Sequence, residues 1–375
     1  MQEFLASRVR TAQNRVIREC RARGVSRRLP LMENLRRMGL RSLVDVGILS
    51  LLDLVLPESS AQEPRAGEAL SSRPHILRID TNAPIMRNEL RSNFLWLDLD
   101  DAEQQIERKL RLGQITSEEA EQLRHWARDG YVVLPGSIPH DLIDRALEDV
   151  ERVWRERRHV CIDVLTDGRR TYVDEIDSSL RSVPHKLNDL YLSSPSALEI
   201  FMHPRIVRFA ELVFENSVVG CNSLTFEFGS QQPAHIDHVY MTPHPPRRLI
   251  ASWIAMEDVK PEAGPLQLWP GSHRLPPYDF EGSYHYRPEL ESKHTDYVAQ
   301  QKERFARSQF MAKKGDVLLW HAFFVHGGGT IEDPRARRRS MACHYYSGEC
   351  MTNASAPMTP YGKASYLTKA VADPV

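Results

Sequence analysis

Short strands separated by turn residues dominate the second half of the chain. Beyond residue 220, apolar or alternating runs are divided by Pro and Gly, as in NSLTFEFG, LIASWIAMEDV, PLQLWPGS, GDVLLWHAFFVHGGG and RRRSMACHYYS. Runs of this length, each bounded by turn residues, are typical of strands rather than helices. We therefore expect a mainly β core, built as a sandwich or barrel.

Helical patterns precede this β region. The stretch ITSEEAEQLRHWARDG opens with a capping pattern, in which Thr116 or Ser117 precedes Glu118 and Glu119, and its helix is expected to end at Gly130. YVVLPG then predicts a short buried strand, and PHDLIDRALEDVERVWRER predicts a second amphipathic helix. The combination indicates a mainly β protein with flanking helices.

The N-terminal part of the chain has a different composition. Residues 1–56 show helical spacing of apolar residues, and 57–74 are rich in Pro, Ser, Gly and Ala, as in a linker. Residues 1–41 hold eleven arginines, no lysine and three acids, which fits a packed helical arm, a membrane or partner surface, or a transit peptide. We predict an Arg-rich extension over 1–100 and one catalytic domain over 101–375.

Composition limits the classes of partner and compartment. The net charge of -1 gives no global attraction to nucleic acid. The five cysteines are widely spaced with no C-x-x-C pair, which argues against a disulfide framework and favours the cytoplasm. No stretch approaches the length of about 20 apolar residues that a membrane span needs. We expect a small-molecule substrate and make no prediction of oligomeric state.

A candidate metal site lies in PAHIDHVYM. In a strand His235 and Asp237 share one face, while His238 points to the other unless a turn intervenes. A second histidine from a distant strand, His321 or His326, would complete two histidines and one carboxylate. That set leaves positions open and is typical of non-haem Fe(II) oxygenases, whereas structural zinc sites are closed. The alternative is a surface or core histidine beside a loop aspartate.

A candidate carboxylate receptor lies farther along the chain. The segment RARRRSMACHYYS places Arg338 and Ser340 two residues apart, and therefore on one face of a strand. A guanidinium beside a hydroxyl suits a carboxylate, because the guanidinium can bind both of its oxygens.

These stretches, with EEAEQLRHWARDGYVVLPG, LIASWIAMEDVKPEAGPLQLWPGSHR and GDVLLWHAFFVHGGG, resemble the phytanoyl-CoA dioxygenase family over roughly residues 115–350. The resemblance implies a double-stranded β-helix, a jelly-roll or cupin-like fold, that uses Fe(II), 2-oxoglutarate and dioxygen. It implies that His235, Asp237 and His326 bind iron. Arg338, with Ser340 beside it, would bind the distal carboxylate of 2-oxoglutarate, although one residue of slippage leaves Arg337 or Arg339 open.

The resemblance also suggests two further cosubstrate contacts. Trp253 would line the cosubstrate cavity or be a plain core residue. Lys186 would be a basic residue near the cosubstrate or a surface lysine.

The implied reaction is hydroxylation of an unactivated C–H bond, because related halogenases have a small residue where this chain has Asp237. Desaturation, cyclisation and demethylation use the same ligands. Residues 275–308 form either a substrate lid or a surface insertion. Two other functions stay open, namely a membrane-associated oxygenase of a lipid or glycolipid, recruited by the Arg-rich arm, and a non-catalytic β-helix binding protein.

Overall fold

A computed structural model describes residues 93–281, 284, 286–351 and 357–368. The helices expected over 1–56, the linker over 57–74 and most of the extension over 1–100 lie outside these residues. The division of the chain at residue 100 and the membrane or partner contact of the arm therefore stay predictions. Within the described ranges, no helix combines the length and the apolar character needed to cross a membrane.

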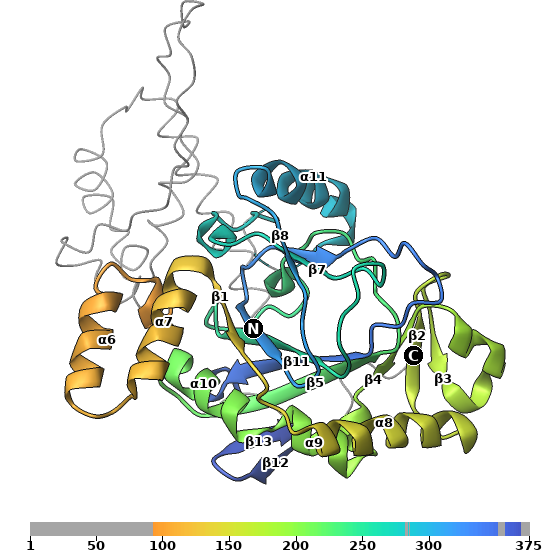
Figure 1. Cartoon of the computed structure of the whole chain (residues 1–375). Helices are drawn as coiled ribbons and strands as arrows, with labels where there is room; N and C mark the ends of the chain where they lie inside the picture. Colours follow the sequence, from red (N-terminus) through yellow and green to blue (C-terminus); the bar gives the residue numbers. More distant parts are fainter. Residues whose placement is uncertain (1–92, 282–283, 285, 352–356, 369–375) are drawn as a thin grey trace, which may run out of the picture. The chain divides into compact units, whose positions relative to one another are not determined.

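Two sheets form the framework of the described chain (Figure 1). The large sheet has the spatial order β1 (Tyr131–Leu134), β9 (Val317–His321), β6 (Leu249–Ala255), β11 (Ser340–Ser347), β5 (Val218–Phe226), β4 (His185–Asn188), β2 (Cys161–Val164) and β3 (Arg169–Tyr172). A hairpin of β12 (Met358–Tyr361) and β13 (Ala364–Leu367) joins it through β5. The small sheet contains β10 (His326–Gly328), β7 (Leu266–Leu268) and β8 (Ser308–Phe310).

The chain alternates between these sheets as it runs from β5 to β11. It passes from β5 to a bridge beside β10, returns through β6, visits β7 and β8, and returns through β9 before β10 and β11. This path is the double-stranded β-helix, and the predicted fold class is confirmed. The run GDVLLWHAFFVHGGG forms two strands, β9 and β10, which belong to different sheets.

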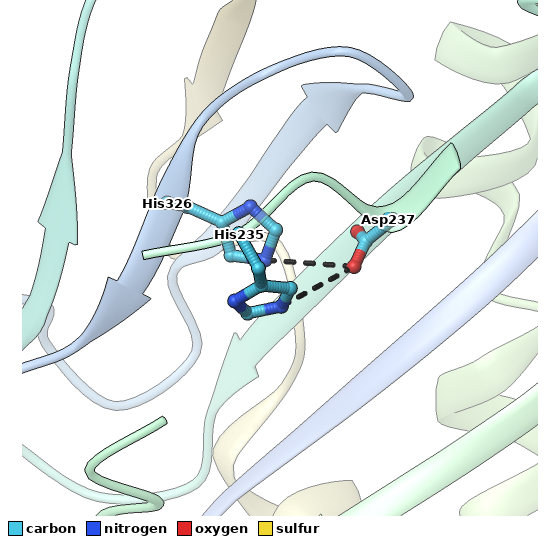
Figure 2. A group of neighbouring side chains, drawn as sticks. All are labelled: His235, Asp237 and His326. Atoms are coloured by element: carbon cyan, nitrogen blue, oxygen red, sulfur yellow. Dashed lines mark ion pairs between the residues drawn. The ribbon is translucent and has the colours of Figure 1, made fainter. Parts of the chain in front are cut away.

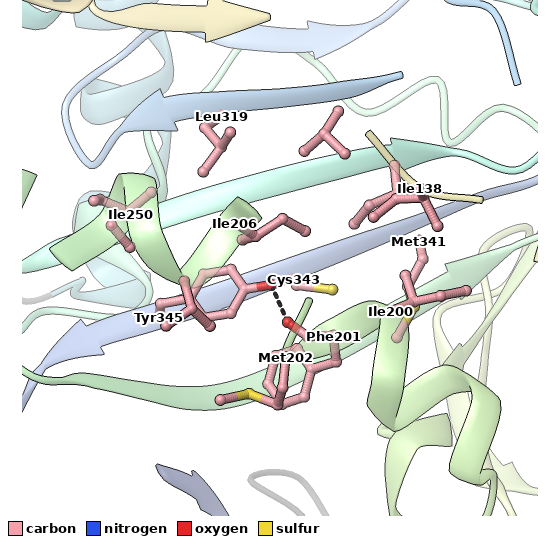
Figure 3. Packing of buried hydrophobic residues seen from close by; sticks show 14 of the residues in the cluster. Ile138, Ile200, Phe201, Met202, Ile206, Ile250, Leu319, Met341, Cys343 and Tyr345 are labelled. Carbon is pink, nitrogen blue, oxygen red and sulfur yellow. Dashed lines mark hydrogen bonds between the residues drawn. The ribbon is translucent and has the colours of Figure 1, made fainter. Parts of the chain in front are cut away.

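Helices cover the face of the large sheet opposite the small sheet (Figure 1). They are α7 (Ser117–Asp129), α8 (His140–Arg155), α9 (Pro195–Phe201) and α10 (Pro204–Phe214), while α6 (Ala102–Arg111) packs against α7 and α11 (Glu291–Lys302) follows β7. Strand alternation sends Leu319 and Cys343 into this helical core, where the Tyr345 hydroxyl donates to the carbonyl of Phe201 at 2.7 Å (Figure 3). A second core lies between the sheets and contains Trp253, Leu268 and Trp320.

The predicted start and end of α7 are confirmed. The hydroxyl of Thr116 accepts from the amide of Glu119 at 3.1 Å, and the Glu119 carboxylate accepts from the amide of Thr116 at 2.8 Å. Gly130 ends the helix with φ of 80°, a left-handed conformation that favours glycine. The strand β1 follows Gly130 directly and pairs with β9 at the edge of the large sheet.

Thr116→Ala is expected to lower the free energy of unfolding by about 1 kcal/mol, because it removes the capping acceptor of α7. Urea denaturation followed by circular dichroism measures this change. Ser117→Ala is the matched control, since Thr116 rather than Ser117 is the capping residue. Equal losses in the two variants would contradict the assignment of the cap.

Candidate metal centre

Three side chains predicted as ligands meet at one point (Figure 2). One ligand atom from each of His235, Asp237 and His326 lies within 4.8 Å of the others; Asp237 and His326 are buried, and the His235 side chain is 12% exposed. Oδ1 of Asp237 is 3.6 Å from Nε2 of His235 and 3.7 Å from Nε2 of His326. Among the residues that the structure describes, this is the one group of three or more His, Cys, Asp or Glu side chains with such spacing.

Backbone pairing brings the two histidines together across some ninety residues of sequence. His235 and His326 form an isolated antiparallel bridge, with N–O distances of 2.9 and 3.2 Å. The glycines after His326 allow this approach, because a Cβ on Gly328 would lie 2.7 Å from the amide nitrogen of Gln231. FVHGGG therefore supplies a histidine, and its glycines allow the two segments to approach closely.

Asp237 reaches the cluster by a different route from the one predicted. The sequence pattern suggested a strand in which His235 and Asp237 share a face. Instead, Asp237–Val239 form a 3₁₀ turn directly after the bridge at His235. The turn carries the carboxylate toward the histidines, so the pairing was predicted correctly but its geometric reason was wrong.

Both histidines are oriented by their backbone. Nδ1 of His235 lies 2.8 Å from the carbonyl of Pro233, and Nδ1 of His326 lies 3.1 Å from the carbonyl of Phe324. A carbonyl can only accept, so each Nδ1 carries the proton and each Nε2 keeps its lone pair. The lone pairs are on the nitrogens that face Asp237, which is the arrangement a metal ion requires.

The protonation states also suit a metal ion. Burial lowers the pKa of His326 to about 4, so its imidazole is neutral near pH 7. Burial opposes ionisation of Asp237, but the adjacent His326, His235 and His344 outweigh it and hold the pKa of that carboxyl well below its ordinary value. A neutral imidazole and an ionised carboxylate are the forms that bind metals.

The other histidines considered from the sequence lie away from the cluster. His238 is fully buried, and its ring stacks on Phe323 with 4.3 Å between centroids. Nε2 of His321 lies 3.5 Å from Oδ2 of Asp98, on the side of β9 that faces a separate buried group. Neither residue lines the cavity that contains His235, Asp237 and His326.

The second oxygen of Asp237 has partners that sequence reasoning missed. Oδ2 accepts a hydrogen bond of 2.8 Å from the indole Nε1 of Trp320. Nε2 of His344 lies 3.6 Å from the same oxygen, and its Nδ1 lies 2.7 Å from Oδ1 of Asn222. His344 could have been found, because alternation along β11 puts it on the face of Arg338 and Ser340. Trp320 gives no such signal, because its contact depends on how strands pair.

Three consecutive arginines directly before β11 have different partners. Arg337 pairs with Glu227 at 3.5 Å, and Arg339 pairs with Glu257 at 2.7 Å. Arg338 is 1% exposed and lines the same cavity as His235, Asp237 and His326. In the described part of the chain no carboxylate lies within ion-pair distance of Arg338, and its Nη1 donates to the carbonyl of Gly264 at 2.6 Å. Burial lowers the pKa of Arg338 to about 10, which leaves it charged near pH 7.

Ser340 and Trp253 accompany Arg338. Ser340 is fully buried and its hydroxyl has no hydrogen-bond partner among the described residues, although it is not one of the residues that line the cavity. The Trp253 ring lines the cavity and lies 5.6 Å from the Arg338 guanidinium. Lys186 also lines the cavity, where it pairs with Asp163 at 3.2 Å and is therefore not a free surface lysine.

The cavity has a volume of about 370 Å³ and is lined by both polar and apolar side chains. Besides the cluster and Arg338, polar side chains line it from β3, β4 and β5, among them Arg170, Asn188 and Asn222. Tyr240 also lines the cavity, is 48% exposed and has its ring 5.2 Å from that of Tyr286. Tyr286 of the segment 275–308 thus contacts a residue that lines the cavity, and the choice between a substrate lid and a surface insertion stays a prediction.

Comparison with known proteins gives one family. The family model described as Phytanoyl-CoA dioxygenase (PhyH) matches residues 126–339, more than half of the chain. "Phytanoyl-CoA dioxygenase, peroxisomal" of Homo sapiens is 23% identical over 246 residues, covering 61% of this chain and 69% of that protein. "Probable phytanoyl-CoA dioxygenase" of Caenorhabditis elegans is 21% identical over 252 residues, covering 63% and 77% respectively.

Solved structures with a similar chain path have been found as well. The epimerase SnoN in complex with Fe3+, alpha ketoglutarate and nogalamycin RO has a TM-score of 0.48 and 18% identity, covering 68% of this chain and 99% of that chain. EctD from S. alaskensis with 2-oxoglutarate and 5-hydroxyectoine has a TM-score of 0.45 and 20% identity, covering 63% and 77%.

Proposed function

The chain belongs to the phytanoyl-CoA dioxygenase family, whose members are Fe- and 2-oxoglutarate-dependent oxygenases, and on that premise we propose that it hydroxylates an unactivated C–H bond of a small-molecule substrate. In this proposal His235, Asp237 and His326 hold the iron, while Arg338 and Ser340 hold the distal carboxylate of 2-oxoglutarate. Trp253 forms a wall of the cosubstrate site.

The donor set of the cluster fits iron. Two imidazole nitrogens and one carboxylate oxygen are the ligands of non-haem Fe(II) oxygenases, and they leave three positions for a chelating cosubstrate and dioxygen. A structural zinc site would require a fourth protein ligand. The orientation of both Nε2 atoms and the ionised state of Asp237 support the same assignment.

The single observation that carries the proposal is the state of Arg338. A guanidinium that is 1% exposed and has no acidic partner in the described chain is costly, because a buried charge normally needs an opposite charge. It lines the same cavity as the metal cluster. A carboxylate of a bound ligand would supply the missing charge, and the buried hydroxyl of Ser340, two residues along the chain, has no hydrogen-bond partner among the described residues.

The reaction divides between the bound groups and the protein. Iron and 2-oxoglutarate supply oxidative decarboxylation to succinate and carbon dioxide, coupled to oxidation of the substrate by dioxygen. The chain holds the metal with three side chains and orients the cosubstrate from Arg338. The buried rings of Trp253 and Trp320 keep water from the reacting atoms.

Two features support hydroxylation and a small polar or amphipathic substrate. Asp237 supplies a carboxylate at the position where related halogenases have a small residue. The cavity lining includes the polar side chains of Asn188 and Arg170 together with the rings of Trp253 and the partly exposed Tyr240. We propose that the substrate enters beside Tyr240 and that residues 275–308 act as its lid.

Anaerobic addition of 2-oxoglutarate to the Fe(II)-loaded protein is expected to produce a weak visible charge-transfer band, because chelation by a 2-oxo acid requires open positions on the metal. Absorption spectroscopy measures it, with succinate in place of 2-oxoglutarate as the control, since succinate lacks the 2-oxo group. Absence of the band at saturating concentrations would favour a non-catalytic binding protein.

A further inference from the structure

Trp320 contacts two of the three candidate ligands. Its indole N–H donates to Oδ2 of Asp237 at 2.8 Å, and its ring packs on His326 with 4.5 Å between ring centroids. The side chain is 3% exposed and lies between the two sheets. Its backbone pairs on both sides, with Tyr131 of β1 and Ala251 of β6, so the indole is carried by an internal strand of the large sheet.

The two oxygens of Asp237 consequently face different partners. Oδ1 faces Nε2 of both histidines, at 3.6 and 3.7 Å. Oδ2 accepts the Trp320 hydrogen bond, whereas the His344 ring nitrogen at 3.6 Å is too far for one. The indole therefore decides which oxygen is available at the centre of the cluster.

We propose that Trp320 is a positioning residue that restricts Asp237 to metal coordination through Oδ1 alone. The inference rests on the proposed function and deepens it, because it concerns how the metal keeps its open positions. A carboxylate can bind a cation through one oxygen or both. Coordination by both oxygens would occupy one of the three positions that the chelating cosubstrate and dioxygen need.

The substitution Trp320→Phe removes the donor and keeps an aromatic ring beside His326. We expect the variant to bind Mn(II) about 10- to 100-fold more weakly than the wild type, the effect typical of losing a hydrogen-bond partner of a metal ligand. Titration calorimetry of the metal-free protein with Mn(II) measures this without turnover. Trp154→Phe is the matched control, because that indole is 5% exposed and its N–H has no hydrogen-bond partner in the described chain.

A second titration separates positioning from packing. Once saturated with Mn(II), Trp320→Phe is expected to bind 2-oxoglutarate more weakly than the saturated wild type, because the released Oδ2 competes for a coordination position. A loss of packing alone would weaken Mn(II) binding but leave the affinity of the loaded protein for 2-oxoglutarate unchanged.

Three results have distinct meanings. Unchanged Mn(II) affinity in a folded Trp320→Phe variant overturns the inference, and so does unchanged 2-oxoglutarate affinity of the Mn(II)-saturated variant. A wild-type protein that binds no Mn(II) overturns the proposed metal site instead. Circular dichroism of Trp320→Phe and Trp154→Phe establishes that each compared protein is folded.

Discussion

Arg338→Met is expected to raise the 2-oxoglutarate concentration for half-maximal succinate formation by about 30-fold or more. Truncating one partner of a buried, hydrogen-bonded charge pair costs about 2–5 kcal/mol, and each 1.4 kcal/mol is about tenfold in affinity. Methionine fills a similar volume without the charge, so the loss reports the guanidinium rather than a cavity. Titration of 2-oxoglutarate at saturating Fe(II), with succinate as the product measured, gives the value.

Two neighbouring arginines provide the comparison. Arg335→Met is the surface control, because its side chain is 91% exposed. Arg337→Met tests which arginine of the run is the anchor, because Arg337 pairs with Glu227 and does not line the cavity. Neither is expected to change the 2-oxoglutarate requirement. An equal shift in Arg337→Met would move the anchor away from Arg338.

The same substitution should separate function from stability. Without cosubstrate, Arg338 is a buried charge with no acidic partner in the described chain, so its replacement by an apolar side chain is expected to leave thermal stability unchanged or to raise it. Saturating 2-oxoglutarate with Mn(II) should stabilise the wild type, since a ligand that binds only the folded state shifts unfolding. The variant should lose most of that shift. Destabilisation of the cosubstrate-free variant would instead assign Arg338 a structural role.

Local sequence patterns were sufficient to predict features that depend on residues close together in the chain. The capping box at Thr116, the left-handed Gly130 and the alternation along β11 all depend on residues within a few positions of each other. Alternation also put Arg338 and Ser340 on one face. That this face is the inner one followed from the family resemblance, because alternation alone treats both faces alike.

Features that depend on strand pairing could not be predicted. The segment between His321 and His326 contains no Gly or Pro, so nothing local marks the turn that separates β9 from β10. The hydrogen bond from Trp320 to Asp237 joins residues far apart in sequence and depends on the register of two sheets. Asp98 similarly meets Arg247 and His321 only in the folded chain. The features that local patterns did not predict therefore depend on contacts between residues far apart in the sequence.

Asp98 supplies a matched control for the largest expected effect on metal binding. Like Asp237, it is a buried carboxylate beside a histidine, with Nε2 of His321 at 3.5 Å, but it pairs with Arg247 and lies outside the group of three candidate ligands. Its loss breaks a buried ion pair, which costs about 3–5 kcal/mol of stability. Asp98→Asn is therefore expected to lower the unfolding temperature and to leave the Mn(II) affinity of the folded protein unchanged.

Asp237→Asn is expected to show the opposite behaviour. The amide keeps the shape of the side chain and its oxygen can still accept from Trp320, but the only carboxylate in the cluster is lost. Loss of a direct ligand should weaken Mn(II) binding by more than the roughly 10- to 100-fold typical of an outer partner, and abolish substrate-coupled succinate formation. Calorimetry and product analysis measure both. Retained Mn(II) affinity in Asp237→Asn, or equal losses in Asp98→Asn, would show that Asp237 is not the metal-binding carboxylate.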